Sequence, residues 1–309
     1  MRPIEDPSRR RWVGGGLRWL AGAGLGGAAA GCAVMPPMSA AGSTEAGLAL
    51  YARASRAHGI DGYTGITDIN VAYEGHWHGL VQRLQPVLAD AGFRRTSEER
   101  LLPVLGAVGQ AHAGPMGSKH VVRRRDASGQ GDDIRVWRNG VPVQDAEALR
   151  ASALVADAYR LFLLGPLAYA GSDAGFDVGD PIWIGDRRCD ALLVAQVPGF
   201  GQRGEDKVVM YIDQRDGLMR RVRFTLEGLQ STRGAIVEVD TDAHVDRHGV
   251  RWPTRFFERL VRPIPSLPVH RWRLTGLDVN RGYGRDALAL VGSAAFGGAA
   301  APPATPLRG

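Results

Sequence analysis

The clearest pattern of hydrophobic and polar positions along the chain lies at residues 207–226. Two alternating runs flank a turn at 214–217 that ends in Gly217. This alternation predicts an antiparallel hairpin with one buried and one wet face, because successive side chains of a strand point to opposite sides. In the second run the expected buried positions are Leu218, Val222, Phe224 and Leu226, and the expected wet positions are Met219, Arg221, Arg223 and Thr225.

Similar runs continue on both sides of this hairpin, separated by Gly, Asp or Pro. No alternation of strands with helices appears from residue 181 onward, so the pattern predicts an up-and-down antiparallel sheet. Residues 106–117 are rich in glycine and are interpreted as a connection, whereas residues 93–104 favour no element. The expected strands are 63–73, 119–125, 133–138, 181–185, 189–197, 207–213, 218–226, 234–245, 254–262 and 270–279.

The strongest helical pattern covers residues 145–164. Asp145 lies at its positive end, an apolar stripe runs along it, and Gly165 ends it. Its last turn is apolar all round, which is typical of a helix buried by a sheet that curves around it. Helical spacing also appears at 44–58 and, interrupted by Pro86, at 78–91. We therefore expect an α+β fold, mostly β, in which a curved antiparallel half-barrel wraps around or is lidded by a few helices.

Residues 1–31 have the features of an export signal. The stretch at 8–13, Ser-Arg-Arg-Arg-Trp-Val, resembles the twin-arginine motif, with Trp12 and Val13 in place of Phe and Leu. The uncharged residues at 20–31 are too few to span a bilayer, which takes roughly 20 helical residues, but suit a signal segment. We expect a protein of the periplasm.

The signal segment ends in Ala29-Ala30-Gly31-Cys32, which resembles the lipobox of bacterial lipoproteins, although that family usually has Leu where Ala29 stands. The resemblance implies lipidation of Cys32, hence a membrane anchor, and Ala33 after it implies the outer membrane. The alternative is ordinary cleavage and a soluble periplasmic protein. Residues 32–43 are expected to form a tether, 44–290 a single domain, and 291–309 a disordered tail.

Charge gives little reason to expect a nucleic-acid partner. The chain has 38 basic and 32 acidic residues, of which residues 1–31 hold five and two, so the remainder carries a net charge of only +3. A surface of nearly balanced charge lacks the excess of cations that binds the phosphate backbone. We therefore predict no nucleic-acid binding.

Motifs for chemistry are weak. The stretch at 199–204 matches the spacing of a dinucleotide fingerprint, but a strand rather than a helix follows it, which favours a hairpin loop. His76 and His78 would share a strand face, yet no further ligand stands at metal-site spacing. Cys189 is interpreted as a buried inert thiol rather than a nucleophile. We expect no metal, cofactor or catalytic residue; an enzyme on this scaffold would need a buried polar cluster that the sequence does not reveal.

Aromatic residues gather in the predicted strands and in the 145–164 helix. One interpretation is that they fill a packed core. The other is that the curved sheet is wider than its helices can cover, so that the aromatic residues line an apolar cavity for a lipid-like ligand. Arginines of the last strands either surround the mouth of that cavity or belong to a wet sheet face. The candidate lining residues are Phe162, Trp183, Tyr211, Phe224, Phe256 and Trp272, and the arginines are Arg255, Arg259, Arg262, Arg271 and Arg273.

The segment Tyr211-Ile212-Asp213 followed by Gly217-Leu218 and Arg221 resembles the hairpin of the outer-membrane lipoprotein-carrier superfamily (LolA/LolB-like). That family commonly has Asp-Pro-x-Thr-Gly-Leu there, whereas this chain has Gln214-Arg215-Asp216. The resemblance implies a half-open barrel that holds acyl chains, with the helices at 44–58 and 145–164 as lid or plug. The expected function is that of an envelope lipoprotein that binds or carries an apolar ligand. The alternative is a non-enzymatic assembly factor that binds another envelope protein through its sheet.

Overall fold

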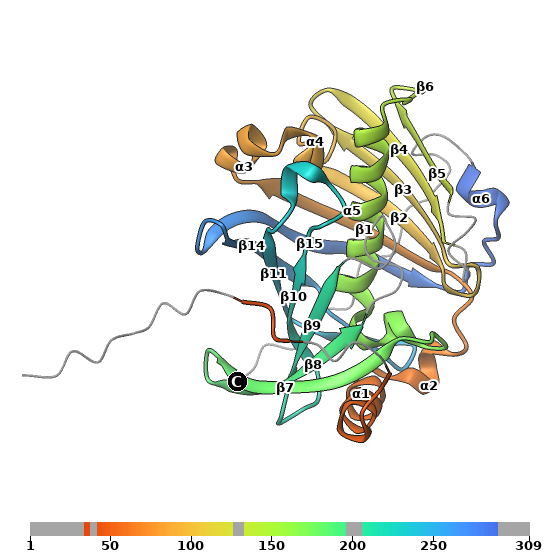
Figure 1. The fold of residues 1–309 in the computed structure, drawn as a ribbon. Coiled ribbons are helices and arrows are strands. Elements are labelled where there is room, and N and C mark those ends of the chain that lie inside the picture. The colour runs from red at the N-terminus through yellow and green to blue at the C-terminus, as the bar shows by residue number, and fades with distance from the viewer. Residues whose placement is uncertain (1–33, 38–41, 126–132, 196–205, 290–309) are drawn as a thin grey trace, which may run out of the picture. The chain divides into compact units, whose positions relative to one another are not determined.

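The computed structural model describes residues 34–37, 42–125, 133–195 and 206–289 (Figure 1). The predictions about the signal segment, Cys32, the motif at 199–204 and the tail lie outside these residues. Within them, thirteen antiparallel strands form one open sheet whose edges do not meet, as the sequence pattern predicts. Their order across the sheet is β6-β5-β4-β3-β2-β1-β15-β14-β11-β10-β9-β8-β7.

The sheet consists of two meanders that meet in its middle. One runs from the centre to an edge as β1 (Ile69–Trp77), β2 (Thr96–Leu102), β3 (Ala107–Gly114), β4 (Gly117–Arg124), β5 (Asp133–Arg138) and β6 (Val141–Pro142). The other starts at the opposite edge and returns as β7 (Gly175–Ile184), β8 (Arg187–Ala195), β9 (Lys207–Asp213), β10 (Met219–Thr225), β11 (Ile236–Asp242), β14 (Arg255–Arg262) and β15 (Leu267–Val279). β1 and β15 form the seam between them, with Ile69 opposite Val279.

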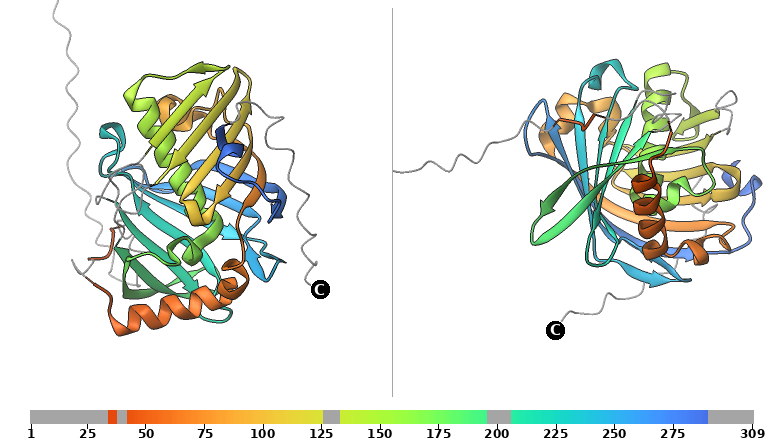
Figure 2. Two further views of the ribbon diagram at one scale, coloured as in Figure 1. Left: turned by 90° about the vertical axis from the view of Figure 1, so that its right-hand side faces the viewer. Right: turned by 60° about the horizontal axis from the view of Figure 1, so that its bottom comes forward.

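A single long helix, α5 (Ala146–Leu164), occupies the concave side of the sheet (Figures 1 and 2). The Asp145 side chain caps it by accepting from the Ala148 N–H at 2.7 Å, as the sequence predicts. Among the described residues, the stretch Ala146–Tyr169 is long and apolar enough to cross a membrane, but here it is buried as a core helix. The main hydrophobic core lies between α5 and the inner face of both meanders.

Shorter helices lie at the two ends of α5. α1 (Glu45–His58) and α2 (Ile60–Tyr63) lie at one end, with α1 packed against β7 (Figure 1). α3 (Gly79–Leu84) and α4 (Pro86–Ala89) lie at the other end, and α4 contacts α5. Pro86 begins α4, so the helical stretch expected at 78–91 is present but broken there. The small pair β12 (Val245–Arg247) and β13 (Val250–Trp252) and the helix α6 (Asp286–Ala289) complete the described elements.

Three details of the sequence interpretation are wrong. The stretch at 106–117 contains a strand, β3, whose small residues are poor strand formers but pair on both sides with β2 and β4. The strand expected at 63–73 begins only at Ile69, because α2 precedes it. The hairpin at 207–226 forms, but a register shift between Met219 and Arg221 places Met219 in the main core and not on the wet face.

The described part of the predicted tether lies against the outer face of the sheet, away from α5. Met35 packs against a second hydrophobic cluster formed by Cys189, Ala191, Leu193, Val209 and Tyr211. The Arg223 guanidinium donates to the Val34 carbonyl at 3.4 Å. Residues 34–37 therefore contact the folded domain directly.

Candidate functional site

A mostly apolar cavity of about 330 Å³ opens between α5, the α3–α4 pair and the inner face of β10, β11, β14 and β15. Branched and aromatic side chains make up most of its wall. The wall includes Val81 of α3, Leu154 and Phe162 of α5, Phe224 of β10, Leu260 of β14 and Val269 of β15. α3 and α4 are short, six and four residues, and the chain is not helical between Leu84 and Pro86, so these helices cover only part of the concave face.

The rim of this cavity is apolar and exposed. Leu84 on α3 is 50% exposed and Ile264 in the β14–β15 loop is 42% exposed, and both line the opening. Leu80 on α3 is also exposed. The Gln85 side chain donates to the Ser231 carbonyl at 2.8 Å and so connects α3–α4 with the loop on the other side of the opening. An apolar molecule would therefore meet exposed apolar side chains at the rim before it enters the cavity.

Three charged groups interrupt the apolar wall: Arg94 before β2, Glu258 on β14 and Arg233, which is exposed at the rim. The Arg94 guanidinium lies 4.6 Å from the centre of the Trp77 ring and donates to the Leu88 carbonyl at 2.9 Å. Burial raises the pKa of the Glu258 carboxyl to about 7, although Arg94 acts in the opposite direction. This carboxyl is therefore partly protonated near neutral pH.

The structure brings together only some of the predicted lining residues. Phe162 and Phe224 line the cavity, with ring centres 5.5 Å apart. Phe256 and Trp272 stack at 4.9 Å in the adjoining core and border a different hollow on the other face. Tyr211 is buried in the second cluster on the outer face, and Trp183 on β7 is 66% exposed, so neither lines this cavity. Ligand contact by any of the six remains a prediction.

The hollow on the outer face is larger, about 710 Å³, but charged residues dominate its wall. Arg255 pairs with Asp242 at 2.6 Å, and Arg273 pairs with Glu74. Arg259 pairs with Glu238 and Asp240 on the same face. These arginines point away from the apolar cavity, which favours the interpretation that they form a wet, ion-paired sheet face rather than the cavity mouth.

Next to the apolar cavity, the inner face of β2–β4 carries a buried polar cluster that sequence reasoning missed. The Lys119 ammonium pairs with the Asp90 carboxylate at 2.7 Å, and the Arg123 guanidinium pairs with Asp157 of α5 at 3.2 Å. Burial lowers the pKa of Lys119 to about 8, although the charge of Asp90 acts in the opposite direction. Burial also lowers the pKa of His112 well below its usual range. Alternation alone does not reveal this cluster, because it cannot show that polar positions point inward.

The polar cluster contains acids and bases but lacks a catalytic arrangement. Burial raises the pKa of the Glu99 carboxyl, which accepts from the Ser97 hydroxyl at 3.0 Å. Among the described residues, no hydrogen bond joins His112 to Ser97 or Glu99, as activation of a nucleophile would require. The adjoining void measures only about 20 Å³, room for one water and not for a substrate.

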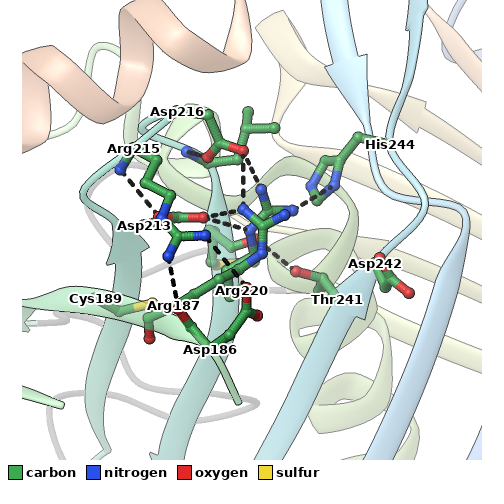
Figure 3. Close-up of polar contacts among 12 residues, drawn as sticks. Asp186, Arg187, Cys189, Asp213, Arg215, Asp216, Arg220, Thr241, Asp242 and His244 are labelled. Atoms are coloured by element: carbon green, nitrogen blue, oxygen red, sulfur yellow. Dashed lines mark hydrogen bonds and ion pairs between the residues drawn. The ribbon is translucent and has the colours of Figure 1, made fainter. Parts of the chain in front are cut away.

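A third polar group lies at the turn of the β9–β10 hairpin (Figure 3). Arg187 and Arg220 both pair with Asp213, and Arg220 also pairs with Asp216. Burial alone would raise the pKa of Asp213, but the Arg215 N–H and the two guanidiniums outweigh it and lower that pKa. Every charge in this group has a partner, so its role is to hold the turn.

Cys189 lies beside this group on β8 and is fully buried. Burial raises the pKa of its thiol to about 11, so almost no nucleophilic thiolate forms at neutral pH. This finding favours the inert thiol over the nucleophile. Within the described part of the chain, no cluster of three or more His, Cys, Asp or Glu side chains could hold a metal ion.

The edge strand β7 has features that oppose pairing with another chain. Pro181 lacks a backbone donor, and a register shift between Gly179 and Ile182 bends the strand. Asp180 adds an exposed charge at the same place. The edge therefore gives no support to the alternative that this protein binds a partner by adding a strand to its sheet.

Comparisons with known proteins found similar structures but no match in sequence. No family model matches the chain, and no curated protein matches it in sequence. The structure is similar to that of a LolA superfamily protein from Nitrosomonas europaea, with a TM-score of 0.48 and 12% identity over 78% of this chain and 96% of that chain. It is also similar to an outer membrane lipoprotein-sorting protein domain from Vibrio parahaemolyticus, with a TM-score of 0.46 and 9% identity over 79% and 96% of the two chains. Both likenesses concern the fold alone.

Proposed function

We propose that this protein binds an apolar or lipid-like ligand in the cavity between α5, α3–α4 and the sheet, as a carrier or binding protein of the cell envelope. The observation that supports the proposal is the cavity of about 330 Å³ with its exposed apolar rim. Each Å² of apolar ligand surface that leaves water contributes about 25 cal/mol, so an alkyl chain of ordinary length gains several kcal/mol on entry.

Ligand extraction from the purified protein, followed by mass spectrometry, tests this function. A neutral fluorescent probe such as N-phenyl-1-naphthylamine tests the cavity itself. Ala158→Phe places a ring inside the cavity from α5 and is expected to reduce probe binding at least tenfold. Trp183→Ala removes an exposed aromatic outside the cavity and is expected to leave binding unchanged. Equal binding by both variants would contradict the proposed site.

We further propose that the protein is exported by the twin-arginine route and held at the outer membrane through acyl chains on Cys32. Only Ala33 separates this residue from Val34, whose carbonyl accepts from Arg223 on the sheet. Cys32→Ser is expected to move the protein from the membrane to the soluble fraction of the periplasm. Cys189→Ala, which alters the other cysteine, is the control and should not change fractionation. Membrane association of the Cys32→Ser protein would refute the anchor.

A further inference from the structure

We infer that the ligand of the apolar cavity is a single-chain alkyl carboxylate whose head lies between Arg94 and Glu258. This inference rests on the proposed function and specifies the class of ligand. The two charged groups belong to the wall of the same cavity, and Arg94 and Tyr159 also line the small void at the border of the polar cluster. The polar head would therefore face this border while the tail follows the apolar wall toward the rim.

The volume of the cavity limits the ligand to one chain. An engineered apolar cavity of about 150 Å³ holds one benzene molecule. The cavity of this protein, about 330 Å³, is roughly twice as large. It therefore accommodates one alkyl chain of moderate length, whereas the several chains of an acylated protein or a phospholipid would not fit without a large opening of α3–α4.

Arg94 gives the site its preference for an anion. Its side chain is only 5% exposed, and its guanidinium lies over the rings of Trp77 and Tyr159. Among the described residues, no carboxylate lies within ion-pair distance of Arg94. Its guanidinium donates to two backbone carbonyls, those of Leu88 and Ala89. A buried cation without a counter-ion is costly, and a ligand anion would relieve that cost.

Glu258 restricts the anion to one that can share a proton. Within the described chain, no hydrogen bond or ion pair reaches its carboxyl group, which faces the cavity. When two carboxyl groups meet in a buried site, one of them holds the proton, and together they carry a single negative charge that Arg94 can balance. A cationic head would be repelled by Arg94, and a doubly charged phosphate would leave one charge uncompensated.

The neighbouring groups add no further charge at the head. His270 on β15 is opposite Glu258 in the ladder, and its Nδ1 lies 2.9 Å from the Tyr159 hydroxyl. Burial keeps the pKa of His270 well below its usual range and raises that of Tyr159, so both are neutral at pH 6–8. Arg233, the other cation of the wall, is exposed at the rim. Glu99 on β2 also interacts electrostatically with Arg94, and burial raises the pKa of its carboxyl, which favours the neutral form. Arg94 and Glu258 therefore decide the charge of the head.

The sign of the pH dependence follows from the proton on Glu258. Burial raises the pKa of Glu258 to about 7, so below this pH the group is mostly protonated and ready to donate to the ligand carboxylate. Above it, binding requires uptake of a proton, and affinity falls up to tenfold for each pH unit. Between pH 6 and pH 8 we expect the affinity for an alkyl carboxylate to fall about tenfold.

Displacement of N-phenyl-1-naphthylamine by dodecanoate, dodecan-1-ol and dodecyltrimethylammonium at pH 6 and pH 8 tests the inference. Dodecanoate should bind at least tenfold more tightly than the other two at pH 6, and this advantage should shrink about tenfold at pH 8. Glu258→Gln mimics the protonated acid, so it should retain dodecanoate binding and abolish the pH dependence. Glu227→Gln, which alters an acid outside the wall of this cavity, should behave as the unmodified protein.

Each of the following results would overturn the inference. Equal binding of dodecanoate and dodecanol would show that the head is not recognised, while the proposed function would stand. If the pH dependence persisted in Glu258→Gln, a group other than Glu258 would be responsible for it. Failure of all three ligands to displace a bound probe would overturn the inference alone, whereas failure of the probe itself to bind would overturn the proposed function as well.

Discussion

His58, the last residue of α1, should make the folded protein sensitive to mild acid. Its Nε2 accepts from the Met219 N–H at 3.3 Å, so its Nδ1 carries the proton and donates to the Ala54 carbonyl at 2.8 Å. The hydrogen bond from Met219 requires the neutral ring, because a protonated Nε2 cannot accept, and burial lowers the pKa of His58 to about 4. Because the unfolded chain takes up this proton near pH 6.5, stability is complete above that pH and is lost as the pH falls toward 4.

The size of the effect follows from the two pKa values. Between pH 7 and pH 5 the unfolded state gains almost one proton at this site and the folded state gains almost none. This difference costs about 2 kcal/mol of unfolding free energy. His58→Gln removes the titration, so its loss of stability between pH 7 and pH 5 should be about 2 kcal/mol smaller than that of the unmodified protein.

Urea denaturation at the two pH values measures this difference, and any packing defect of the variant cancels because each protein is compared with itself. His78→Gln alters an exposed histidine and leaves His58 intact, so it should keep the full pH effect. If His58→Gln loses as much stability as the unmodified protein, the ring is not held neutral in the fold and the reasoning from burial is wrong.

Three further predictions concern single positions in the described structure. Asp157→Ala removes the carboxylate that pairs with the buried Arg123 guanidinium and should lower the unfolding free energy by about 3–5 kcal/mol in a denaturant titration. In a Cys32→Ser background, the buried Cys189 thiol should stay unreactive toward a disulfide reagent in native buffer and react fully in denaturant; rapid native labelling would contradict its burial. Gly59→Ala should destabilise by at least about 1 kcal/mol, because φ is +88° and the new Cβ would lie 1.9 Å from a backbone oxygen, while Gly65→Ala should be nearly neutral.

Local signals predicted the elements that depend on neighbours in sequence. The N-terminal cap of α5 and the hairpin at 207–226 were correct, because Asp145 and Gly217 act within a few residues. The strand β3 was missed, because its small residues form a strand only through pairing with β2 and β4. The inward placement of Met219 depends on a bulge between Met219 and Arg221, and a pattern of strictly alternating apolar and polar residues does not predict a bulge.

The site was only partly predictable for a related reason. Phe162 and Phe224 border the cavity, since each lies on the apolar face of a strongly patterned element. Trp183 and Tyr211 lie elsewhere, because an aromatic residue in a strand can point to either face and the pattern does not identify the concave one. Arg94 and Glu258 have no motif, and they meet only through the fold.

The seam between β1 and β15 has a consequence for how the protein is made. β1 begins at Ile69 and pairs with β15, which ends at Val279, so the middle of the sheet is closed by the last strand that the structure describes. Until β15 has left the ribosome, the nascent chain presents an unpaired edge at β1, and contacts between segments this distant in sequence form slowly. Glu258 and Val269 lie on β14 and β15, so the wall of the cavity is completed only after these strands have been made.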